Sequence, residues 1–99
     1  MSTRPEYPLQ ITFNGRPIFR VVIDQHYRER HGESIDDQLI LELVHELDGG
    51  QFPVEATRGE FQYFTVEPVF RRAEPYRVIL VLCLTDDYLG VVNAFRVNP

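Results

Sequence analysis

The chain has 99 residues, 43% of them hydrophobic, which suits one compact domain and is too little for two. No segment approaches the roughly 18 consecutive apolar residues of a membrane helix, and the first residues lack the apolar run of a signal peptide. The single cysteine, Cys83, excludes an internal disulfide and a multi-cysteine zinc site, so we expect a soluble cytoplasmic protein without membrane contact.

The charges are unevenly distributed along the chain. The net charge is −5, which argues against general coating of nucleic acid. All ten cations are arginines, and none of them falls within residues 33–48, which hold six acidic side chains. The rest of the chain carries nine acids and ten arginines, which leaves room for a local arginine patch that binds RNA.

The N-terminal third predicts a β-hairpin. We assign residues 1–8, which contain two prolines, to a flexible leader and residues 9–99 to a single α+β domain. Apolar and polar residues alternate over 9–13, which is the period of a half-buried strand. Asn14-Gly15 follows and is a strong two-residue turn signal, because both residue types accept a positive φ, and residues 18–23 then form the returning strand.

Two helices are predicted next. Residues 24–31 form a short helix, with Asp24 as its N-cap and Gly32 as its left-handed end. Ser34 caps a longer helix, in which apolar residues recur at helical spacing up to Leu47. The acidic residues of this helix fall on its other side, where we expect a solvated face.

The C-terminal half alternates with the period of strands. Residues 61–70 form one strand, residues 76–84 a second and residues 88–97 the last. The 76–84 strand is apolar on both faces, which predicts a central position with both faces covered. The predicted fold class is therefore α+β: an N-terminal hairpin, with one short and one longer helix packed on a curled antiparallel sheet of three to four C-terminal strands.

Chemistry is concentrated in the segment 26–31. On a helix, His26 and Arg30 lie four residues apart and project from one face. A histidine transfers protons near neutral pH and an arginine neutralises charge on a phosphate, which are the minimum requirements for cleaving RNA without a metal. The alternative is a solvated helix whose arginines and glutamate form surface ion pairs.

Other site types have less support. A metal site from His26 and His31 is disfavoured, because zinc helices place their histidines four residues apart and these are five apart. Cys83 lies between two leucines and is expected to be a buried, inert thiol. No glycine-rich phosphate loop is found, so we expect neither a metal nor a cofactor. Arg96, near the end of the last strand, is placed either for anion binding or for solvation.

The order of these motifs resembles that of a known group of enzymes. A His-x-x-x-Arg element, a helix that begins Ser-Ile-Asp-Asp and a last strand that ends Ala-Phe-Arg are similar to small toxin-type ribonucleases, the RelE/ParE and BrnT-like group. The resemblance implies metal-independent RNA cleavage with His26, Arg30 and Arg96 as catalytic residues, and a cognate antitoxin as partner. All three side chains must then open onto one concave surface. An inactive relative of such enzymes, or a non-enzymatic protein-binding module that includes self-association as a homodimer, is the alternative.

Overall fold

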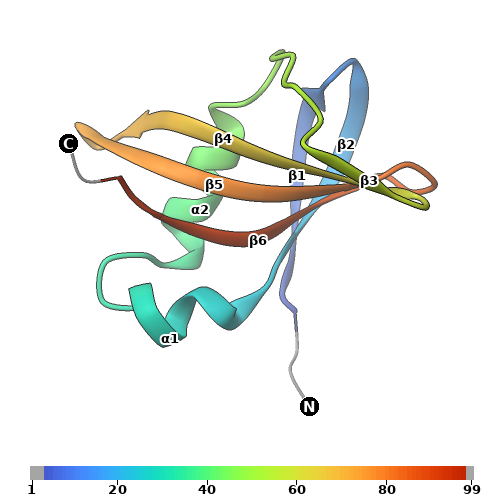
Figure 1. Ribbon diagram of the computed structural model, residues 1–99. Helices are drawn as coiled ribbons and strands as arrows, with labels where there is room; N and C mark the ends of the chain where they lie inside the picture. The colour runs from blue at the N-terminus through green and yellow to red at the C-terminus, as the bar shows by residue number, and fades with distance from the viewer. Residues whose placement is uncertain (1–3, 98–99) are drawn as a thin grey trace.

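One strongly twisted sheet dominates the protein. The structure is a computed structural model and describes residues 4–97. Six strands pair in the order β1-β2-β6-β5-β4-β3, and Figure 1 shows β1 and β2 crossing the direction of β4 to β6. The strands are β1 (Glu6–Phe13), β2 (Arg16–Ile23), β3 (Ala56–Arg58), β4 (Phe61–Arg71), β5 (Glu74–Cys83) and β6 (Tyr88–Arg96). The 3₁₀ turn η1 (Gln25–Tyr27) and the helices α1 (Arg28–His31) and α2 (Asp37–His45) connect β2 to the later strands.

The predicted fold class is wrong. The N-terminal hairpin is part of the main sheet, because β2 pairs with β6 in parallel, with Val21 opposite Leu89. The sheet is therefore mixed and six-stranded, and the two helices are short, with four and nine residues. The pairing joins segments more than 60 residues apart in the chain. Alternation within a strand indicates which residues share a face but not which strand lies alongside, so the sequence pattern did not reveal this neighbour.

The predicted β1–β2 hairpin is confirmed. Asn14 and Gly15 have φ angles of 50° and 75°, the left-handed values that the turn requires. Strand β1 begins at Glu6, so residues 6–8 belong to the sheet and not to a leader. The first three residues of the predicted leader lie outside the described residues.

The ends of the helices differ from the predictions. The side chain of Asp24 accepts a hydrogen bond from the backbone N–H of His26, as predicted, but Gly32 has a φ of −63° and is not a left-handed end. Asp36, and not Ser34, caps α2, because its carboxylate accepts from the N–H of Leu39 at 2.8 Å. Asp36 has the extended backbone that an N-cap needs, whereas the hydroxyl of Ser34 lies 3.5 Å from the carbonyl of His31 within the preceding turn.

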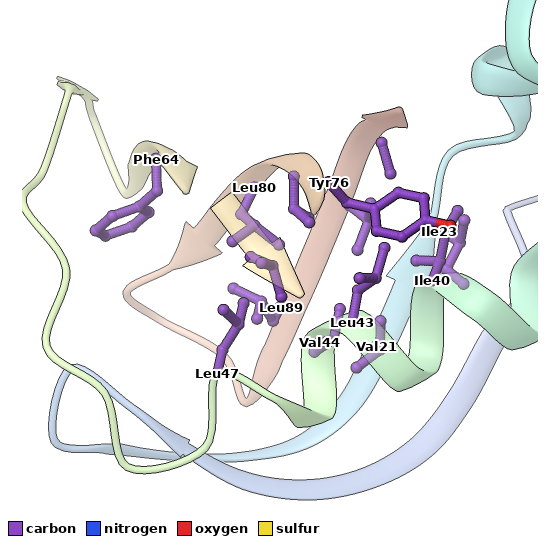
Figure 2. Close-up of a cluster of buried hydrophobic side chains, with 14 of the residues drawn as sticks. Val21, Ile23, Ile40, Leu43, Val44, Leu47, Phe64, Tyr76, Leu80 and Leu89 are labelled. Atoms are coloured by element: carbon purple, nitrogen blue, oxygen red, sulfur yellow. The ribbon is translucent and has the colours of Figure 1, made fainter. Parts of the chain in front are cut away.

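The hydrophobic core lies between α2 and one face of the sheet, here called the inner face. Figure 2 shows Leu43 and Val44 of α2 facing the inner side chains of the strands, and Phe13 meets Phe64 edge-on at 5.0 Å. Strand β5 is central, between β4 and β6, and its Leu80 is fully buried, as predicted. The core side chains of α2 are Leu39, Ile40, Leu43 and Val44.

The opposite face of the sheet, the outer face, has less cover. Ile79 and Val81 of β5 point to it and are only half-buried, so the prediction that both faces of this strand are covered is wrong. Cys83 is buried and unpaired, as predicted. Over residues 4–97, no helix has the length and apolar character needed to cross a membrane.

The acidic face of α2 is only partly solvated. Glu42 accepts hydrogen bonds from Arg71 at 3.0 Å and from Arg72 at 2.7 Å, which join α2 to the β4–β5 turn. These bonds, the one from Arg72 foremost, lower the pKa of Glu42 to about 2. The two residues of the turn, Arg72 and Ala73, have φ angles of 52° and 63°, although neither is a glycine or an asparagine.

Candidate functional site

The candidate site forms where the pairing between β2 and β6 ends. Strand β2 pairs with β6 only as far as Val91, and the chain then leaves the sheet at Asp24. The turn η1 and helix α1 therefore lie beside the second half of β6, as Figure 1 shows. A depression of about 360 Å³ forms there, lined by His26, Tyr27, Arg30, His31, Asn93 and Phe95.

His26 and Arg30 both line this depression. The Nδ1 atom of His26 lies 3.2 Å from a carboxylate oxygen of Glu29, and both side chains are exposed. A carboxylate on one ring nitrogen favours the tautomer whose other nitrogen, Nε2, is free to accept a proton. The contact with Glu29 therefore also orients the ring of His26.

Arg30 differs from most arginines of the chain. Of the ten arginines, all of which lie within residues 4–97, seven have a carboxylate oxygen within 4.0 Å. Arg16 donates to the carbonyl of Leu84, while Arg30 and Arg58 have no acidic partner among the described residues. The guanidinium of Arg30 is thus available to an anion bound in the depression.

His31 is the third functional side chain of the depression. Its ring stacks on Phe95, with ring centroids 5.1 Å apart and an angle of 22° between the planes. The aromatic face limits the motion of the imidazole. Sequence reasoning weighed His31 only as a metal ligand and took Phe95 as a core residue. The spacing along the last strand could have placed Phe95 at the site, because Asn93 and Phe95 are two residues apart and therefore share a face.

Arg96 does not belong to this site. It follows Phe95 directly in β6, so its side chain leaves on the other face of the strand. Its guanidinium lies 3.9 Å from Glu74, and it does not line the depression. The prediction of one concave surface shared by His26, Arg30 and Arg96 is therefore wrong, because the period of two in a strand separates Arg96 from the residue beside it.

A partly buried hydrogen-bond network fixes the helices behind the depression. The hydroxyl groups of Tyr7 and Tyr27 each donate to the carboxylate of Asp37 at 2.6 Å, and the side-chain amide of Gln25 donates at 3.2 Å. Burial favours the neutral form of Asp37, but the hydrogen bonds outweigh it and its pKa is lowered. Burial, followed by the bond to Asp37, raises the pKa of Tyr27. The network joins β1, η1 and the start of α2.

The outer face of the sheet also carries a larger groove of about 600 Å³. It extends from Phe61 and Tyr63 of β4 across Val81 and Gly90 to Val22 of β2. Along β6 the groove ends at Val92, and the depression follows at the next residue.

Neither a metal site nor a known relative indicates a function for this chain. Within the range 4–97, no group of three or more histidine, cysteine, aspartate or glutamate side chains is arranged to hold a metal ion. Comparison of the chain with protein-family models, curated proteins and solved structures finds no match. The functional argument therefore rests on the geometry of the site.

Proposed function

We propose that the protein cleaves single-stranded RNA at the depression between α1 and β6, without a metal ion. The observation that supports this proposal is that two histidines line one depression together with an arginine that has no acidic partner within residues 4–97. Two proton-transfer groups and one cation are what the reaction requires, because a proton leaves the 2′-OH, another reaches the 5′-oxygen and negative charge accumulates on the phosphate.

The roles of the two histidines follow from their neighbours. His26, oriented by Glu29, accepts the proton of the 2′-OH as the O2′–P bond forms. His31, whose ring is held against Phe95, donates a proton to O5′ as the P–O5′ bond breaks. Arg30 binds the phosphate oxygens. The products are a 2′,3′-cyclic phosphate and a 5′-hydroxyl, and Arg96 has no role.

The proposal is tested with purified protein and a labelled single-stranded RNA in the presence of EDTA. We expect a 2′,3′-cyclic phosphate product, and no cleavage of the same RNA when its 2′-hydroxyls are methylated. His26→Ala, His31→Ala and Arg30→Ala should each reduce the cleavage rate by roughly 10²-fold or more.

The chain offers matched controls for these variants. His45 is an exposed histidine of α2, and Arg58 is an arginine without an acidic partner among the described residues. His45→Ala and Arg58→Ala, purified in parallel, should leave the rate unchanged. If all five variants and the wild type cleave equally, the activity comes from a contaminant; if none cleaves RNA, the proposal is wrong.

A modified substrate separates the two histidines. With RNA in which sulfur replaces O5′ at the scissile bond, the leaving group needs no proton, since a thiolate is a good leaving group. We expect this substrate to restore cleavage by His31→Ala and not by His26→Ala. Restoration of the His26 variant alone would reverse the assigned roles.

A further inference from the structure

The groove on the outer face is apolar at its centre. Its walls are formed by Phe61, Tyr63, Val81 and Tyr88, none of which is fully buried, and Val92 at its end is 38% exposed. In the part of the chain that the structure describes, no helix covers this part of the sheet, whereas α2 covers the inner face (Figure 1). A contiguous, partly exposed apolar surface of this kind is typical of a binding site.

The hollow depends on a glycine in the middle of a strand. Gly90 lies opposite Val81 in the β5–β6 ladder, and the side chain of Val81 lies over it. A Cβ atom at position 90 would come within 2.6 Å of Cγ1 of Val81. Any larger residue would push Val81 outward and fill the groove. Glycine weakens a strand interior, so its presence here indicates a close approach rather than strand stability.

One end of the groove carries an excess of negative charge. Arg20 is the only cation there among the described residues, and three carboxylates contact it: Glu6, Asp86 at 3.0 Å and Asp87 at 2.9 Å. Hydrogen bonds from the backbone of Asp87 and from Arg20 lower the pKa of Asp86, so its carboxylate stays ionised at neutral pH. At the other end, the side chains of Arg4 and Asp24 lie 3.5 Å apart, and their opposite charges cancel.

These features select one class of ligand. The carboxylate excess repels the phosphates of a nucleic acid and the headgroups of an acidic membrane, and it attracts a cation. Neighbouring strands are about 4.8 Å apart, so the span from β4 to β2 is roughly 14 Å, the length of about four extended residues. We propose that the groove binds an extended segment of a partner protein, with apolar side chains over Gly90 and a lysine or arginine at the Arg20 end.

The probe is a synthetic five-residue peptide, capped at both ends, with one lysine followed by valine and leucine residues. Its binding to the isotopically labelled full chain is followed by NMR, which detects weak complexes and locates them. We expect amide shifts to be confined to the groove, at Val81, Tyr88 and Gly90, and absent from the exposed face of α2. A matched peptide with glutamate in place of lysine should bind at least threefold more weakly, and one with serine in place of the apolar residues should not bind.

Variants of the chain test the charge argument. The double variant Asp86→Asn, Asp87→Asn keeps the shape of both side chains and removes two negative charges. It should weaken binding of the lysine peptide about three- to tenfold. Glu33→Gln, which removes one charge at an exposed position away from the groove, should have no effect. Unchanged thermal melting of each variant verifies that the fold persists.

Several outcomes would overturn the proposal. Equal binding of the lysine and glutamate peptides would remove the charge argument, and absence of groove shifts with any peptide would remove the site. Hexylamine is tested alongside, and equal binding of this amine would indicate a small-molecule site instead. Sedimentation of the free chain as a dimer, with the groove amides protected from solvent exchange, would assign the face to a second copy. RNA cleavage can fail or succeed independently of all these results.

Discussion

Both faces of strand β5 carry apolar side chains, but the two faces have different surroundings. Leu80 points to the inner face and is fully buried, while its neighbour Val81 points to the outer face and is only half-buried. The difference lies in what covers each face: α2 packs on the inner face, and the groove leaves the outer face open. An apolar run therefore identifies a central strand, but it does not distinguish a core face from a face kept open for binding.

The largest expected effect is on the inner face. Leu80→Ala should lower the free energy of unfolding by roughly 2–5 kcal/mol, because it leaves a cavity under α2. Val81→Ala, the adjacent residue on the outer face, should cost about 1 kcal/mol or less, since that side chain is half-buried. Urea denaturation measures both values. Equal losses would mean that the outer face is covered in solution.

Helix α2, which covers the inner face, can be destabilised at its N-terminus. Asp36→Ala removes the carboxylate that accepts from Leu39 and should cost about 1 kcal/mol in the free energy of unfolding. Ser34→Ala, the residue that the sequence favoured as the cap, should change it by less than about 0.5 kcal/mol. A larger loss for the Ser34 variant would contradict the observed cap.

The turn that meets α2 can be improved. Ala73 has a φ of 63°, which costs a residue with a Cβ atom and costs glycine little. Ala73→Gly should therefore raise the free energy of unfolding by about 0.4–1 kcal/mol, visible as a higher melting temperature. The matched change on the other hairpin, Gly15→Ala, should lower it, because Gly15 has a φ of 75°. A lower melting temperature for Ala73→Gly would show that the turn is not strained.

The smallest effect is a pH dependence of the contact between α2 and the turn. The pKa of Glu42 in the folded protein is lowered from 4.5 to about 2. The stability from its pairs with Arg71 and Arg72 is therefore present above pH 4.5 and is lost as the pH falls toward 2. Glu42→Gln should flatten the pH dependence of stability between pH 2 and 4.5, and it should leave the pH dependence above pH 6 unchanged. An unaltered acid profile in the variant would mean that these exposed pairs do not stabilise the fold.

Local patterns in the sequence correctly indicated local structures. Asn14-Gly15 predicted its hairpin because a two-residue turn depends only on the φ angles that those residues accept. The helical period identified α2, although it misplaced the cap by two residues, since both Ser34 and Asp36 are good capping residues and only the backbone conformation distinguishes them. His26 and Arg30, which are close in the chain, both line one depression, although His26 lies in the 3₁₀ turn η1 and Arg30 in the helix α1.

Contacts between distant segments were decided by the tertiary structure alone. The parallel pairing of β2 with β6 made a six-stranded sheet, and its early end at Val91 left space for α1 beside β6. That placement brought His31 onto Phe95 and left Arg96 on the other face. Sequence periodicity assigns residues to faces within one element, whereas the choice of neighbouring element depends on which apolar faces can be buried together. For this reason the sequence by itself determined five of the six strands, the turn and two residues of the candidate site, whereas packing determined β3, the third residue of the site and the open groove.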